Sequence, residues 1–143
     1  MLTSEREEIK REVEERLGQL KPQADRGPRV RAIVVHPHCP PVVEWVSNDF
    51  PTMYCILGGP PELIPLEEGV DLYCNGYGKL LGLTANRALF ESEAERPWDV
   101  VAGTFLVMGA DEETADQIDL SEAAVKKYTE LIANPVCIWG YRV

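Results

Sequence analysis

The sequence predicts an α+β fold, a single small domain with a mainly antiparallel or mixed sheet and two packed helices, preceded by an N-terminal amphipathic helix. Long hydrophobic repeats of helical period occur near the two ends of the chain, over residues 4–20 and 119–131. Between them, short runs rich in β-branched residues are separated by glycine and proline turns. Because strands and helices do not alternate along the chain, a parallel sheet built of βαβ units is not expected.

The first predicted element is a helix from Ser4 to Leu20. Ser4 and Glu7 fit a capping box, in which each side chain accepts a hydrogen bond from the other residue's free backbone N–H. One face carries a narrow apolar stripe of Ile9, Val13, Leu17 and Leu20. Such a stripe must pack against the domain or against another copy of the helix, so a homodimer through this helix is one expectation.

A boundary is predicted after this helix. Residues 21–28 combine two prolines with a glycine and have the composition of a linker. We therefore divide the chain into an N-terminal helix with its linker, residues 1–29, and an α+β domain, residues 30–143. Residues 1–29 contain seven basic and seven acidic side chains, so the net charge of −10 lies entirely in the domain.

The first half of the domain should contain four strands and a short helix. The helix is expected over residues 48–57, with Asn48 or Asp49 as its cap, Pro51 in its first turn and Gly58 after its end. A hairpin turn is expected at residues 67–69. The predicted strands are Val30–Val35, Val42–Val46, Leu63–Leu66 and Val70–Cys74.

The second half should begin with a turn at residues 75–78, whose glycines would supply the positive φ of a tight hairpin, and a returning strand from Lys79 to Leu83. Val100–Met108 is expected to be one strand, with Gly103 marking a bulge or a close backbone approach.

The C-terminal part of the domain should contain a helix and a last strand. Asp119 and Glu122 should open the helix, Asn134-Pro135 should stop it, and Val136–Tyr141 should form an edge strand. The buried face of this helix is predicted to comprise Leu120, Ala124, Tyr128 and Leu131.

Charge and composition limit the classes of partner. An acidic domain repels phosphate backbones, so no direct nucleic-acid binding is expected. The acidity fits a basic protein partner, imitation of DNA, or solubility alone. No apolar run approaches the roughly 20 residues needed to cross a bilayer, and the N-terminus does not resemble a secretory signal, so no membrane partner and a cytoplasmic location are expected.

The four cysteines stand far apart and include no C-x-x-C pair, so disulfides are not expected. Cys55, Cys74 and Cys137 lie among apolar neighbours and are interpreted as small buried hydrophobes.

Residues 74–89 contain the strongest candidate site. Lys79 and Arg87 are the only basic side chains between Arg31 and Arg96. One reading is structural, with the asparagines forming turns and Arg87 pairing with a carboxylate such as Asp99. The other is a groove for an anionic or amide-bearing ligand or partner, lined by Asn75, Lys79, Asn86 and Arg87. The segment contains no adjacent nucleophile and base, so neither catalysis nor a cofactor is expected.

His36, His38 and Cys39 are weak metal-ligand candidates. Histidines two residues apart on a strand share a face, and a cysteine adds a thiolate. Pro37 disturbs that geometry, and the chain contains no further histidine. An exposed proline-rich loop without metal is therefore the alternative.

Several segments also resemble a family of bacterial and phage proteins known as domain of unknown function three-eight-four-six. The resemblance covers about residues 30–131 and includes an N-x-x-G-K-L-x-G-L-x-x-N-R segment. Relatives tend to carry Glu-Pro-Gly-Lys where this chain has residues 36–39, and often proline in place of Thr84. The matching segments are Val30 to Pro37, Gly58-Gly59, Asn75 to Arg87, Asp99 to Gly109, and Ser121 to Leu131.

The resemblance implies a small α+β domain often found on phages, plasmids and other mobile elements, and it implies no activity. Together with the residue analysis it predicts a non-enzymatic accessory protein that acts by contact with an unidentified protein partner. An acidic DNA mimic that blocks a nucleic-acid-binding protein of the host, and a small-anion-binding domain using residues 75–87, are the alternatives.

Overall fold

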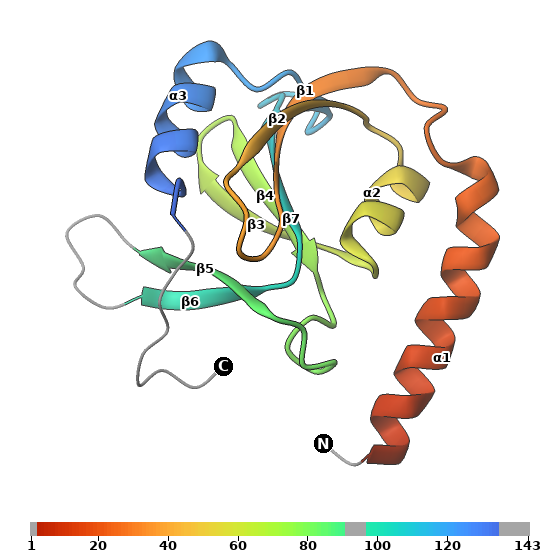
Figure 1. Cartoon of the computed structure of the whole chain (residues 1–143). Helices are drawn as coiled ribbons and strands as arrows, with labels where there is room; N and C mark the ends of the chain where they lie inside the picture. Colours follow the sequence, from red (N-terminus) through yellow and green to blue (C-terminus); the bar gives the residue numbers. More distant parts are fainter. Residues whose placement is uncertain (1–2, 91–96, 135–143) are drawn as a thin grey trace.

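The structure, a computed structural model, describes residues 3–90 and 97–134. Its main sheet has the strand order β2-β1-β7-β4-β3, with the short β8 beside β7, and every pair is antiparallel (Figure 1). A separate antiparallel pair, β5 and β6, forms a second small sheet. The strands are β1 Arg29–Val35, β2 Val42–Ser47, β3 Pro61–Glu67, β4 Val70–Asn75, β5 Ala85–Phe90, β6 Pro97–Ala102, β7 Phe105–Ala110 and β8 Gln117–Ile118.

The helices lie on both sides of the main sheet, and the predicted α+β fold with an antiparallel sheet is confirmed (Figure 1). Helix α2 covers one face, where Met53 and Leu57 pack among side chains of β1 and β7. Helix α3 and the β5–β6 pair cover the other face. The helices are α1 Thr3–Leu20, α2 Phe50–Leu57 and α3 Glu122–Leu131, and a 3₁₀ turn, Lys21–Gln23, follows α1.

Helix α1 packs on the outer side of α2 (Figure 1). Val13 and Leu20 are buried against Tyr54 of α2, and Ile9 and Leu17 pack at the edge of the same cluster. The predicted apolar stripe is therefore covered by this chain's own α2. Helix α1 begins at Thr3, so the predicted cap Ser4 lies inside the helix rather than before it.

Helix α2 forms as its sequence predicts. The carboxylate of Asp49, the N-cap, accepts a hydrogen bond from the Thr52 backbone N–H at 2.7 Å, and Pro51 lies in the first turn. Gly58 ends the helix with a φ of 73°, a left-handed conformation that glycine adopts without strain from a Cβ atom. These are local signals, and they suffice to place the helix within the sequence.

The predicted single strand Val100–Met108 is wrong, because Gly103 separates two strands that belong to different sheets. Gly103 has a φ of 83°, and its N–H donates to the Thr84 carbonyl at 2.7 Å. The chain turns a corner there, from β6 in the small sheet to β7 at the centre of the main sheet. Both strands are apolar because both have buried faces, so the pattern does not reveal the corner.

The predicted strand Lys79–Leu83 is also wrong. This segment forms consecutive turns, closed by hydrogen bonds such as Leu83 N–H to the Gly78 carbonyl at 2.9 Å, and β5 begins at Ala85. Neither Gly76 nor Gly78 has the expected positive φ. The lack of a side chain on Gly78 matters instead because a Cβ atom there would lie 2.7 Å from the Ala102 carbonyl oxygen.

Helix α3 is present, but two details of its prediction are wrong. Its N-cap is Ser121, whose hydroxyl accepts from the Ala124 N–H at 3.1 Å. Asp119 instead accepts a hydrogen bond from the Arg31 backbone N–H. Leu131 is 70% exposed, and Ile132, one residue later, is buried in the core. The expected strand Val136–Tyr141 and Cys137 lie outside the described residues.

Candidate functional site

Asn75, at the end of β4, is buried and bonded on both sides of its amide. Its Nδ2 donates to the Leu57 carbonyl at 3.1 Å, and its Oδ1 accepts from the Tyr77 N–H at 2.9 Å. The side chain therefore ties the C-terminal end of α2 to the turn that follows β4. Both hydrogen-bonding groups of the amide are engaged within the protein.

Asn86 and Arg87 lie side by side in β5, and both are buried. The Nδ2 of Asn86 donates to the carbonyls of Val35 and Gly103, each at 2.9 Å. Asn86 thus joins the end of β1 to the corner between β6 and β7. The predicted polar segment therefore lies inside the domain at this point, not on its surface.

Arg87 is only 1% exposed, and its guanidinium is bonded to oxygens from three parts of the chain. Nε donates to the Ile132 carbonyl at 3.0 Å, Nη2 to the Cys39 carbonyl at 2.6 Å, and Nη1 to Oδ1 of Asn86 at 2.8 Å. The Ile132 carbonyl lies at the C-terminal end of α3, where the helix dipole favours a cation. Burial lowers the pKa of Arg87, and in the described residues its partners are amide oxygens rather than carboxylates.

Lys79 differs from the other three candidates because it is exposed, in the turn-rich loop between β4 and β5. The structure therefore divides the predicted site into three places. Asn75 bonds the end of α2, and Lys79 lies on the surface. Asn86 and Arg87 form a buried polar pair that connects several segments, which we call the internal joint.

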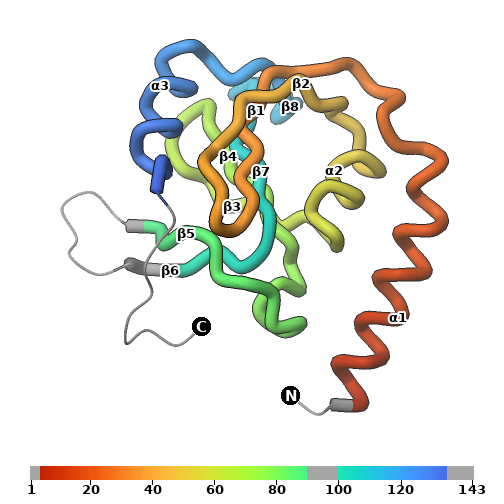
Figure 2. Tube along the Cα trace, in the orientation of Figure 1, coloured from red at the N-terminus to blue at the C-terminus, as the bar shows by residue number. Residues whose placement is uncertain are grey.

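The loop between β1 and β2, residues 36–41, lies against the same internal joint (Figure 2). The Nδ1 of His36 lies 2.9 Å from the Thr104 hydroxyl, and the Cys39 N–H donates to the His36 carbonyl at 3.2 Å. His38 has a φ of 64°, and all three candidate ligands are exposed. Among the described residues, no three His, Cys, Asp or Glu side chains are grouped to hold a metal ion.

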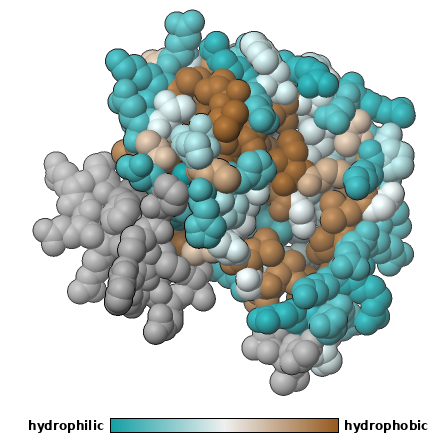
Figure 3. Space-filling model, in the orientation of Figure 1, coloured by the Kyte–Doolittle hydropathy of each residue, from teal (hydrophilic) through white to brown (hydrophobic). Residues whose placement is uncertain are grey.

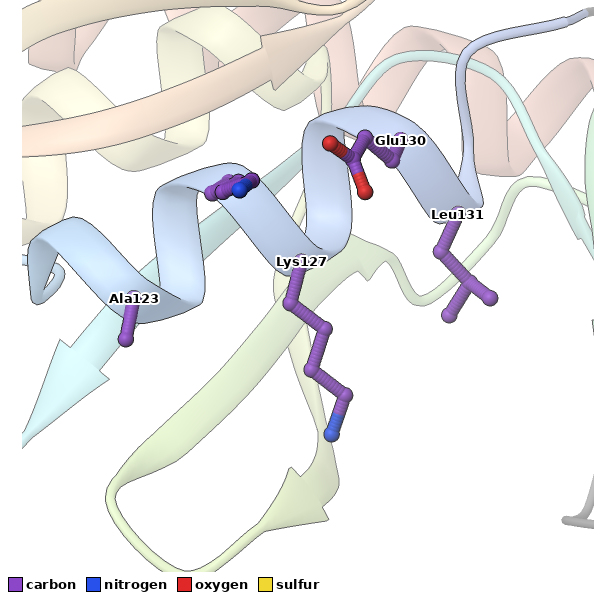
Figure 4. Close-up of a pocket in the computed structure, with 5 residues that line it drawn as sticks. Ala123, Lys127, Glu130 and Leu131 are labelled. Carbon is purple, nitrogen blue, oxygen red and sulfur yellow. The ribbon is translucent and has the colours of Figure 1, made fainter.

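Among the described residues, two open grooves lie elsewhere on the surface. One, of about 570 Å³, runs along α3, where Ala123, Lys127 and Leu131 point the same way from the helix (Figure 4). Lys127 pairs there with Glu67 of β3 at 2.9 Å. The other groove, of about 410 Å³, lies between α1 and α2 and is lined by Glu12, Glu15, Arg16, Gln19, Phe50, Tyr54, Pro60 and Tyr77.

Strand β2 forms one edge of the main sheet and carries exposed apolar side chains. Trp45 is 57% exposed, and Val42 and Val43 are exposed to 45% and 42%. Figure 3 shows apolar surface in the upper middle of the molecule, where Figure 1 places β1 and β2. The sequence did not reveal this edge, because an apolar run looks the same on an exposed edge strand as on a buried one.

The comparisons with known proteins agree with the resemblance seen in the sequence. No helix among the described residues is both long and apolar enough to span a membrane. The chain matched no curated protein and no solved structure. One family model matches residues 30–133, which is most of the chain, and its description is Domain of unknown function (DUF3846). The chain therefore belongs to the DUF3846 family.

Proposed function

We propose that the protein acts by protein–protein contact, and that its partner adds an extended segment to the free edge of β2. The observation that carries this proposal is the edge itself. Within the described residues β2 pairs only with β1, and it exposes Val42, Val43 and Trp45. An unpaired strand edge offers backbone N–H and C=O groups to an incoming strand, and exposed apolar side chains add contact area.

The opposite edge of the sheet supports this choice by contrast. Strand β3 contains Pro61 and Pro65, which have no N–H to donate, and its register shifts between Pro65 and Glu67. Prolines and bulges are the usual means by which edge strands avoid pairing. Strand β2 contains no proline from Val42 to Ser47, so it is the edge suited to docking.

The register indicates what a partner strand should carry. Val43 lies opposite Ile33 and Trp45 opposite Arg31, so both point to the sheet face that α3 covers. Glu44 lies on the other face. A partner with apolar residues facing Val43 and Trp45 and a basic residue facing Glu44 fits this pattern. The net charge of −10 also favours a basic partner.

Site-specific photo-crosslinking in an extract of the native host tests the proposal. A crosslinker at position 43 should capture a discrete partner, whereas one at position 63, on the exposed Leu63 of β3, should not. Because Trp45 is exposed, Trp45→Ala should weaken capture of the partner with little change in the melting temperature. Leu63→Ala, at an exposed position on β3, is the matched control. Equal capture at positions 43 and 63, or capture indifferent to Trp45→Ala, would contradict the β2 interface.

We also propose that the partner belongs to the life cycle of a phage or another mobile element. This part rests on the family resemblance alone. Genes for phage or plasmid functions should flank the gene for this chain in most genomes that carry it. Consistent placement among housekeeping genes would overturn this part and leave the β2 interface untouched.

A DNA mimic is the second candidate, and the observation that favours it is a local concentration of carboxylates. Glu68, in the β3–β4 turn, lies beside Glu112, in the turn after β7. A hydrogen bond with Glu68 and its negative charge raise the pKa of Glu112. A mimic should capture host proteins that bind duplex DNA, and added DNA should displace them. Retention unaffected by duplex DNA, or by Glu68→Gln with Glu112→Gln, would count against mimicry.

The small-anion alternative has less support. Of its four proposed residues, Asn75, Asn86 and Arg87 direct their donors to carbonyl or amide oxygens of the protein. The two grooves described above are lined by other residues.

A further inference from the structure

We infer that the groove between α1 and α2 binds a basic, proline-rich segment of a partner protein. This surface is distinct from the β2 edge, so the inference goes beyond the proposed function. In this inference α1 has a binding role, because it forms one wall of the groove. Helix α1 precedes the residues that the family model matches.

The floor of the groove is aromatic. Phe50 and Tyr54 lie one helical turn apart on α2, with ring centroids 5.8 Å apart and planes tilted by 57°. Tyr77 and Pro60 complete the lining on the side of the β4–β5 loop. Phe50 is 48% exposed, which leaves much of its ring open to a ligand.

This floor is held in place by packing. Tyr54 is buried against Val13 and Leu20 of α1, and Tyr77 packs at the edge of the same cluster. The Nε of Arg6 donates to the Leu80 carbonyl at 3.1 Å and ties the first part of α1 to the loop that contains Tyr77. Tyr54 and Tyr77 therefore need little reordering on binding, which lowers the entropic cost of association.

The wall contributed by α1 is acidic. Glu12, Glu15 and Gln19 follow one another at helical spacing and line the groove, and Arg16 is its single basic residue. The lining therefore carries two carboxylates against one guanidinium. Together with the acidic domain behind it, this wall attracts a cationic ligand and repels an anionic one.

Size and chemistry together indicate the occupant. A volume of about 410 Å³ has room for a few side chains of an extended chain. Grooves lined by aromatic residues suit the polyproline II conformation, which is already extended before it binds. Arginine or lysine beside the prolines would pair with Glu12 and Glu15 and stack on the exposed face of Phe50.

The probe for the test is a labelled synthetic polyproline peptide that carries arginines, titrated into the full chain and followed by fluorescence anisotropy. The same peptide with glutamates in place of the arginines is the ligand control. Saturable binding of the arginine peptide alone is expected. Phe50→Ala and Glu15→Lys should each weaken binding about tenfold or more.

A matched variant separates a specific groove from general attraction to an acidic protein. Glu14→Lys makes the same charge change on α1, at an exposed position outside the groove, and it should leave the affinity nearly unchanged. Trp45→Ala should also leave it unchanged, because Trp45 is on β2. Thermal melts of each variant verify that α1 remains folded on α2.

Three results would overturn the inference. The first is the absence of saturable binding of the arginine peptide to the unmodified chain. The second is an equal loss of affinity with Glu14→Lys and Glu15→Lys. The third is a loss of binding with Trp45→Ala, which would indicate that the peptide binds at the β2 edge. Only the last result would bear on the β2 proposal, so the two surfaces can fail independently.

Discussion

The guanidinium of Arg87 donates from Nε to the backbone oxygen of Ile132, 3.0 Å away and 45 residues further along the chain. This bond ties β5 to the end of α3. The same group reaches the Cys39 carbonyl, so one buried side chain connects the small sheet, the last helix and the loop after β1. Hydrogen bonds from this one cation therefore join three segments that are distant in sequence.

Arg87→Ala should therefore destabilise the protein by roughly 3 kcal/mol. The substitution removes charge-assisted hydrogen bonds and leaves buried carbonyls, including those of Ile132 and Cys39, without their donor. Urea denaturation measures the change, and the exposed Lys79→Ala, expected to stay within about 0.5 kcal/mol, is the control. An unchanged denaturation midpoint for Arg87→Ala would show that Arg87 does not stabilise the fold. Residues 75–87 would then again be a candidate binding site.

Gly59 and Asn75 should show strong energetic coupling. A Cβ atom on Gly59 would lie only 2.7 Å from the Cγ of Asn75, so Gly59→Ala should displace the side chain that bonds the Leu57 carbonyl. Gly59→Ala and Asn75→Ala should each lower the free energy of unfolding by roughly 1–3 kcal/mol. The double variant should lose less than the sum of the two, because truncation of Asn75 makes room for the new methyl group. Additive costs in a urea-denaturation cycle would contradict the predicted contact.

Gly18→Ala tests whether α1 unfolds together with the domain. Gly18 is exposed in the last turn of α1, and an added Cβ atom would meet no heavy atom within 4 Å outside its chain neighbours and the helix's own backbone. Alanine at such a helical site is more favourable than glycine by roughly 0.5–1 kcal/mol. If the packing of α1 on α2 is cooperative with the rest, the global unfolding free energy should rise by this amount. No change in the global transition, with a separate early transition for α1, would mean that residues 1–29 unfold independently.

Tyr128→Phe should change the stability of the protein in a way that depends on pH. The Tyr128 hydroxyl donates to Oε1 of Glu67 at 2.6 Å, and Lys127 donates to the same atom at 2.9 Å. The hydrogen bond from Tyr128, followed by that from Lys127, lowers the pKa of Glu67 below its ordinary value of 4.5. A carboxyl whose pKa is lowered by folding contributes stability above its ordinary pKa and loses it as the pH falls through the lowered value.

The cost of Tyr128→Phe should accordingly be about 1 kcal/mol at neutral pH, reduced by the partial exposure of Glu67, and it should shrink as the pH falls below 4.5. Tyr73→Phe is the matched control, because the Tyr73 hydroxyl accepts from the neutral amide of Gln117 at 3.0 Å. Its cost should not vary over the same acid range. A cost of Tyr128→Phe that stays constant with pH would contradict the assigned bond to Glu67.

Local chemistry by itself determined a good part of this fold. Asp49, Pro51 and Gly58 define both ends of α2 through contacts within a few residues, and Gly69, with a φ of 82°, marks the turn of the β3–β4 hairpin. Such signals depend on backbone geometry and near neighbours, so the sequence is enough to place them. The α+β class followed in the same way from the order and period of the apolar residues.

Only the tertiary structure decided where the candidate site residues lie and which surfaces are exposed. A basic side chain beside turn residues is expected at the surface, yet Arg87 is buried because carbonyls from the β1–β2 loop and from the end of α3 converge on it. The division of residues 100–108 at Gly103 depends likewise on a hydrogen bond to Thr84, in another segment. Trp45 is exposed because β2 is the last strand of its sheet. Each outcome depends on the approach of segments far apart in the chain, and a local apolar or polar pattern carries no information about that approach.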